Sequence, residues 1–134
     1  MGYFKKFVFL IVFFIGANNA NASTSELIGV IGAAIGDIKN QNNEKLVNGS
    51  KIFYGDTIIS KEQSNAQILF LDQTAITVGE NSELTIDEFI YDPESNDGSF
   101  VSNVKSGTVK FITGQISNKN PDNLEVKIPT GTLG

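Results

Sequence analysis

Residues 64–86 have the sequence SNAQILFLDQTAITVGENSELTI, in which apolar or small side chains alternate with polar ones in three short runs. Because successive side chains of a β-strand point to opposite faces of a sheet, this period of two predicts three strands that each bury one face. The side chains expected to point inward are Ala66, Ile68 and Phe70, then Thr74, Ile76 and Val78, then Leu84 and Ile86.

The same alternation continues toward the C-terminus. Val109 and Phe111 alternate with polar residues, and so do Leu124, Val126 and Ile128. No segment after the first 22 residues has a sustained helical period. The sequence therefore predicts an all-β fold, with a compact β-sandwich, a barrel or a short β-solenoid-like domain as the alternatives.

Turn-forming residues separate the predicted strands. Both residues of Asn48-Gly49 tolerate the positive φ of a type I′ turn, so a hairpin is predicted between Leu46-Val47 and Ile52-Phe53. Residues 79–82 are expected to join two strands in the same way. Polar loops are predicted at 92–98 and 118–123.

The segment from Leu27 to Ile38 is apolar but is interrupted by three glycines. We expect two short strands with a bend near Gly32, because glycine inside a strand marks a bend or a close backbone approach. The Gly32 and Gly36 spacing also occurs in membrane helices, but this run is too short to span a bilayer.

Composition excludes many functions. The chain has 134 residues, which corresponds to one domain, and it contains no Cys, no His and no Trp. Disulfides, thiolate metal sites and imidazole chemistry are therefore impossible within it. Acidic residues outnumber basic ones by 15 to 10, so a nucleic-acid partner is not expected, since phosphate binding needs a basic surface. We expect no cofactor, no metal and no enzymatic activity.

The first 22 residues have the pattern of a secretory signal peptide. A positively charged start precedes an apolar run at 7–15, and Ala20-Asn21-Ala22 is an A-x-A cleavage pattern. The apolar run is shorter than the roughly 20 residues of a membrane-spanning helix. We therefore expect a mature domain at 23–134, with 8 lysines against 15 acidic residues, no transmembrane span, and a periplasmic or extracellular location.

An ordered series of motifs begins at Gly55. It comprises Gly55-Asp56-Thr57-Ile58-Ile59-Ser60, the stretch from Ser64 to Thr74, and Gly79-Glu80-Asn81-Ser82 followed by alternating residues. In this order the motifs resemble the FecR domain, the periplasmic module of the iron-dicitrate sensor family. Gly107-x-Val109-x-Phe111 and Ile128-Pro129-Thr130-x-x-Leu133-Gly134 resemble the continuation seen in secreted members.

The resemblance implies a stand-alone exported member of that family, because transcription-regulating members carry an anti-sigma segment and a transmembrane helix where this chain has a signal pattern. Related sequences continue past the Leu-Gly pair, so the alternative is a fragment. Gln73 departs from the glycine of the family's D-G-T turn, and Ser60 departs from the usual threonine. The family-motif residues are Gly55, Asp56, Ser64, Phe70, Asp72, Thr74, Asn81, Ser82, Gly107, Pro129 and Thr130.

The polar motif residues have two interpretations. Asp56, Asp72 and Asn81-Ser82 either contact a ligand or accept backbone hydrogen bonds in turns, and the turn role is favoured. The loop at 92–98 carries oxygen-bearing side chains at alternate positions, as calcium sites do. It lacks the closing bidentate Glu, so a solvated loop is favoured over a metal site.

Catalytic interpretations are weaker still. Glu83 and Asp87 are the carboxylate pair available for glycoside chemistry, and their spacing along one strand is too wide for either glycosidase geometry. Ser-Lys dyads such as Ser64 with Lys61, or Ser106 with Lys105, are common surface features. We expect no catalytic residue.

We therefore expect a non-catalytic, exported FecR-like module that binds an envelope or surface protein through sheet edges and turns, as a sensor or interaction domain. The alternative is an N-terminal structural or display module of a larger secreted or surface protein. Most aromatic side chains are expected in the core, with Tyr91 as the best exposed candidate for a contact. The aromatics after residue 22 include Phe53, Tyr54, Phe89, Tyr91, Phe100 and Phe111.

Overall fold

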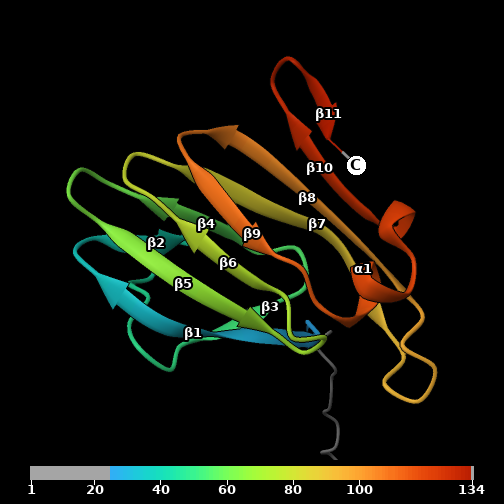
Figure 1. Cartoon of the computed structure of the whole chain (residues 1–134). Coiled ribbons are helices and arrows are strands. Elements are labelled where there is room, and N and C mark those ends of the chain that lie inside the picture. Colours follow the sequence, from blue (N-terminus) through green and yellow to red (C-terminus); the bar gives the residue numbers. More distant parts are fainter. Residues whose placement is uncertain (1–24, 134) are drawn as a thin grey trace, which may run out of the picture.

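The computed structural model describes residues 25–133, and the predicted signal peptide at 1–22 lies outside this part of the chain. Two β-sheets pack face to face around one apolar core (Figure 1). The all-β prediction is confirmed, and the sandwich is the correct alternative. Sheet A has the strand order β3-β1-β5-β6-β9, and sheet B has the order β11-β10-β8-β7-β4-β2.

The strands are mostly short. A five-residue helix, α1 (Gln115–Lys119), and a 3-10 turn, η3 (Pro121–Asn123), precede the last two strands. The strands are β1 (Leu27–Ile35), β2 (Ile38–Asn40), β3 (Lys51–Phe53), β4 (Thr57–Ser60), β5 (Asn65–Phe70), β6 (Ala75–Val78), β7 (Glu83–Tyr91), β8 (Gly98–Ser106), β9 (Val109–Ile112), β10 (Leu124–Ile128) and β11 (Gly131–Leu133).

The core consists of the side chains that the period of two assigns to the inner faces. All eight inward residues predicted within 64–86 are buried, which confirms that prediction. At the centre, the ring centroids of Phe70, Phe89 and Phe100 lie 4.9–5.7 Å apart in stacked and edge-on contacts. Such aromatic groups bury much of the apolar area of a small domain and so dominate its core.

The predicted hairpin at Asn48-Gly49 is wrong. Gly49 has a φ of +87°, but Asn48 does not have a positive φ, and the Ser50 N–H donates to the Val47 carbonyl oxygen. This is a type II β-turn, which does not direct two strands into a hairpin. β3 therefore pairs with β1 of sheet A and not with Leu46-Val47.

Two further turn predictions also need correction. Residues 79–82 connect β6 of sheet A to β7 of sheet B, so they form a corner between sheets and not a hairpin. The predicted loop at 118–123 contains the end of α1 and all of η3, which are too short to produce a detectable helical period.

The bend in the first apolar segment lies later than predicted. β1 continues through Gly32, where its register with β5 shifts by one residue between Ile31 and Ala33. The strand ends at Ile35, and the next residue, Gly36, has a φ of +84° that turns the chain toward β2. Gly32 is therefore a bulge, and Gly36 is the site of the break.

Two serines hold the corners at which strands change sheets. The Ser64 hydroxyl accepts from the Asp37 N–H at 2.8 Å and donates to the Glu62 carbonyl. The Ser82 hydroxyl likewise accepts from the Thr108 N–H at 2.9 Å and contacts the Glu80 carbonyl at 3.0 Å. Each hydroxyl supplies partners for backbone groups that have left their sheet ladder.

These corners relate the two sheets to each other. The strands of sheet A can be numbered by position from β3 to β9, and those of sheet B, without β11, from β10 to β2. Strands at the same position in the two sheets then take part in corresponding corners. The β1–β2 corner corresponds to the β8–β9 corner, and the β4–β5 corner corresponds to the β6–β7 corner. The strand order is thus two-fold pseudosymmetric. It departs from this symmetry in the additional β11 and in β10, which is parallel to β8 whereas β3 is antiparallel to β1.

The contribution of the Ser82 hydroxyl to stability can be tested, with Ser102 as a matched control. Ser82→Ala leaves the Thr108 N–H without its acceptor, and we expect the free energy of unfolding to fall by about 1–3 kcal/mol. Ser102 on β8 is fully buried, and its hydroxyl has no partner among residues 25–133. Ser102→Ala should therefore leave stability unchanged or raise it by about 1 kcal/mol. Urea unfolding curves measure both values, and equal losses in the two variants would refute the assigned role of Ser82.

Candidate functional site: an open sheet edge and its groove

The motif residues do not converge on one cleft. They lie in turns, in corners and in the core. Gly55 occupies a turn with a φ of +85°, Asn81 precedes the Ser82 corner with a φ of +51°, and Gly107 lies against Ser82. Phe70 belongs to the aromatic centre, and Pro129 and Thr130 form the exposed turn between β10 and β11.

Asp72 is fully buried and organises the turn between β5 and β6. Its carboxylate accepts from the Thr74 N–H at 3.0 Å, from the Thr74 hydroxyl at 2.9 Å and from the Ile116 N–H at 3.2 Å. The Asp72 carbonyl accepts from the Gln115 N–H at 2.7 Å. Asp72 therefore fixes the first turn of α1, whose N–H groups have no partners inside the helix, and Thr74 holds the Asp72 carboxylate in place.

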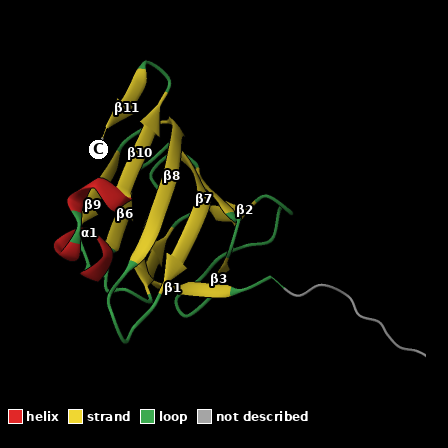
Figure 2. Cartoon of the chain, turned by 90° about the vertical axis from the view of Figure 1, so that its right-hand side faces the viewer, coloured by secondary structure: helices red, strands yellow, loops and turns green. Residues whose placement is uncertain are grey.

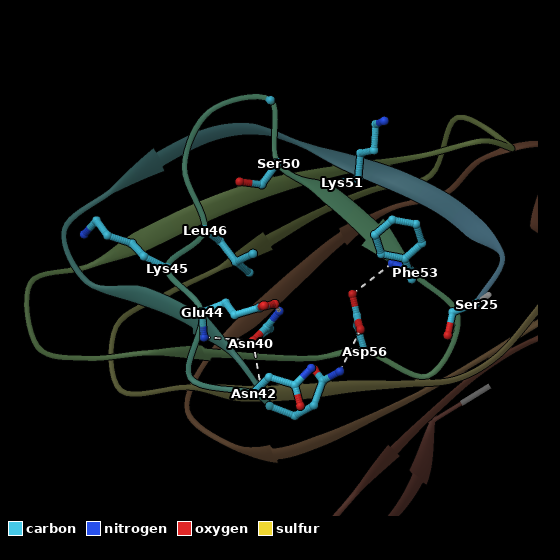
Figure 3. A pocket seen from close by; sticks show the side chains of 12 residues that line it. Ser25, Asn40, Asn42, Glu44, Lys45, Leu46, Ser50, Lys51, Phe53 and Asp56 are labelled. Carbon is cyan, nitrogen blue, oxygen red and sulfur yellow. Dashed lines mark hydrogen bonds between the residues drawn. The ribbon is translucent and has the colours of Figure 1, made fainter. Parts of the chain in front are cut away.

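Asp56 performs a similar function next to a polar cleft of about 650 Å³ (Figure 3). Its carboxylate accepts from the Phe53 N–H at 2.9 Å and from the Gln41 side-chain amide at 2.8 Å. On the same side, the Asn40 side chain donates to the Glu44 carboxylate at 2.8 Å and accepts from the Glu44 N–H at 3.0 Å. These bonds hold the segment that connects β2 to β3 in place.

The loop at 92–98 does not gather metal ligands. The Lys119 ammonium lies 2.8 Å from the Asp97 carboxylate, and hydrogen bonds from Lys119 and Ser95 hold the pKa of Asp97 below its usual range. The Tyr91 hydroxyl donates to Asn96 at 2.8 Å. Tyr91 is half-buried and Tyr54 is more exposed, so the expectation that Tyr91 is the best exposed aromatic is wrong. Within residues 25–133 no three acidic side chains are close enough to hold one metal ion.

None of the residues considered for catalysis lines the polar cleft above or the groove described below. Ser64 is buried and bonded to backbone groups, whereas Lys61 is exposed. Glu83 and Asp87 lie on one strand, β7.

The most distinctive unpaired element is β9, the last strand of sheet A. It pairs with β6 on one side, and no strand within the described residues pairs with its other side. The Gly79 N–H donates to the Thr108 carbonyl at 2.8 Å, and hydrogen-bonded pairs alternate along an antiparallel ladder. The backbone groups of Lys110 therefore face β6, and those of Val109 and Phe111 face the open edge.

An apolar groove of about 420 Å³ runs beside this edge, between β9 of sheet A and β10 of sheet B. Figure 2 shows β10 and β11 extending past the end of the sandwich, with α1 next to β9. We call this feature the β9 groove. Its apolar side chains are Val104, Val109, Phe111, Leu124, Val126 and Ile128.

The sequence predicted the inward side chains of β9 and β10 but not the groove between these strands. The alternation predicted that Val109, Phe111 and the β10 residues point toward the interior, but it did not predict that the two sheets separate here. β10 pairs in parallel with β8, and this pairing between distant parts of the chain has no local sequence signal. Within the described part of the chain, no helix has the length and apolar character of a membrane span.

Together these features define a small all-β sandwich domain whose motif residues build turns and corners. The profile of the family described as FecR protein matches residues 56–134, more than half of the sequence. The chain belongs to the FecR family, which confirms the resemblance found in the sequence. Family membership supports a sensory or signalling-related module, and FecR domains are typically periplasmic. No curated protein and no solved structure matches the chain.

The departure at Gln73 gives a direct test of the family turn. Gln73 has a φ of +76°, a left-handed conformation that favours glycine, the residue usual at this position in the family. We expect Gln73→Gly to raise the free energy of unfolding by about 0.5–1 kcal/mol. The hydrogen bond from Gln115 that is also lost is exposed and contributes little.

The matched control is Gln67→Gly. Gln67 is also exposed, but it lies inside β5 without a positive φ, so glycine there should cost about 1 kcal/mol. Thermal and urea unfolding of the two variants measure the difference. If Gln73→Gly destabilised the protein as much as Gln67→Gly does, the left-handed turn would be refuted.

Proposed function

We propose that this protein is an exported, non-catalytic interaction module of the cell envelope, which recognises a partner protein by adding a strand of that partner to β9. The observation that carries the proposal is the open β9 edge beside an apolar groove. An exposed sheet edge supplies backbone hydrogen bonds, and pockets beside it select alternate side chains of the added strand.

The carboxylate pair and the Ser-Lys pairs considered for catalysis line neither the polar cleft nor the β9 groove, which favours binding over catalysis. Membership of the FecR family favours a sensory role, in which partner binding is the event that is reported. The signal-like segment at 1–22 favours function outside the cytoplasm.

The site of partner binding can be mapped by photo-cross-linking in cells that express the full chain. A benzophenone amino acid at Lys110, exposed on β9, should form an adduct of defined mass. The same probe at Gln67, exposed at the centre of sheet A, should not. No adduct at position 110, or equal adducts at both positions, would contradict recognition at the edge.

A backbone change tests whether the recognition is strand addition. Val109→Pro removes an outward N–H and leaves the ladder with β6, as proline is tolerated on the outer side of an edge strand. It should abolish the adduct formed from position 110. Val109→Ala keeps the N–H and should retain most of that adduct. Survival of the adduct in the proline variant would show that the edge backbone is not used.

Export is tested by intact mass. Cleavage after Ala22 should leave a chain that begins at Ser23, recovered from the periplasmic or extracellular fraction. An uncleaved chain in the cytoplasm would contradict the proposal. A substantially larger mass would favour the alternative, a module of a larger surface protein.

A further inference from the structure

We infer that the β9 groove takes an extended segment antiparallel to β9, with a leucine-sized side chain in the groove and acidic side chains on its exposed face. The inference rests on the proposed function and specifies the chemistry of the partner. Its basis is that the chain already places such a segment of its own on the equivalent edge of sheet B.

That edge is β2, the last strand of sheet B. Beyond it, the segment 44–46 runs antiparallel to β2, with a bridge between Lys39 and Lys45. The Asn40 N–H donates to the Glu44 carbonyl at 3.0 Å, and the Leu46 N–H donates to the Ile38 carbonyl at 2.8 Å. The outward backbone groups of β2 are thus covered by the chain itself.

Leu46 completes the core on that side. Its side chain is 5% exposed and belongs to the central apolar cluster, although the segment around it is exposed. The bonds of Asn40 and Asp56 described above keep the 41–50 segment in place (Figure 3). One edge of the sandwich is therefore covered by an extended segment with a single buried leucine.

The β9 edge is equivalent to the β2 edge, residue by residue. The Lys61 N–H donates to the Asp37 carbonyl next to β2, as the Gly79 N–H donates to the Thr108 carbonyl next to β9. Counting from these bonds, the Asn40 N–H corresponds to the Phe111 N–H, and the Ile38 carbonyl corresponds to the Val109 carbonyl. In the described residues no segment covers these two groups of β9.

The groove is large enough and apolar enough to take a partner side chain equivalent to Leu46. Its volume of about 420 Å³ exceeds that of one leucine side chain, and six apolar residues line it. A strand added to β9 would direct every second side chain inward, toward Phe111 and Leu124. Apolar residues at alternate positions are therefore required of the partner.

The charge of β9 determines which residues are favoured between the apolar residues of the partner strand. Lys105, Lys110 and Lys127 are exposed on the strands around the groove, and Glu125 is the one acidic residue on β8, β9 and β10. The described residues as a whole are acidic, with 15 carboxylates against 8 lysines in residues 25–133. Lys110 points to the outer face of sheet A, so acidic side chains on the outer face of the partner strand would lie beside it. Lys105 and Lys127 alternate with residues that line the groove and therefore point to the outer face of sheet B.

The test uses three eight-residue peptides and ¹⁵N-labelled protein expressed from the full sequence. The first has the sequence of residues 42–49, NNEKLVNG. The second carries Lys45→Glu in that sequence, and the third adds Leu46→Asp to the second. Amide shifts of Val109 and Phe111 report binding to the β9 edge.

We expect the Lys45→Glu peptide to bind about two- to fivefold more tightly than the first at low salt, with the advantage lost at high salt. The Leu46→Asp peptide should bind at least about tenfold more weakly, because it loses the buried apolar contact. Val109→Pro in the protein should abolish binding, while Val109→Ala should retain it.

Three outcomes would overturn the inference: no shift at millimolar peptide, shifts confined to residues 38–40, or sedimentation showing that a second copy of the chain occupies the edge. If the peptides fail but cells still give an adduct at position 110, the partner has a different chemistry and the proposed function stands. If the peptides bind but no adduct forms, the proposed function fails and the groove chemistry stands.

Discussion

The two serine hydroxyls at the corners are the interactions on which the rest of the sandwich depends. Strands that change sheets within a few residues leave the hydrogen-bonded ladder, and their buried backbone groups then need other partners. A hydroxyl group both accepts and donates, so Ser64 and Ser82 each tie together two backbone segments. With these ties in place, both sheets keep the same strand order and enclose one core.

The shared order has a consequence for function, because it creates two equivalent lateral edges and the chain covers only one within residues 25–133. The 41–50 segment is long enough to fold back over β2 before it enters β3, and its amides and carboxylates hold it there. The connection from β9 instead leads into α1 and then to β10, which diverges from β9. The difference between these two connections leaves the groove.

The period of two predicted the buried faces of β5, β6 and β7 correctly, because burial of one face is a local property of a strand. It does not indicate which sheet a strand joins, and for this reason the hairpin predicted at residues 79–82 is wrong. The segment with Leu46 was misassigned because a single buried leucine produces no period. The departure at Gln73 left the geometry of the family's D-G-T turn open, and the left-handed φ there is the conformation that a glycine favours.

An uncovered strand edge also exposes a protein to unwanted association with copies of itself. Lys110 lies near the middle of the four-residue β9, so two copies joined antiparallel through this strand would bring their lysines close together across the new pair. Like charges placed opposite each other destabilise such a pair, and the overall negative charge of the chain adds repulsion between whole molecules. The same lysine that would attract an acidic partner therefore disfavours pairing of β9 with the β9 of a second copy.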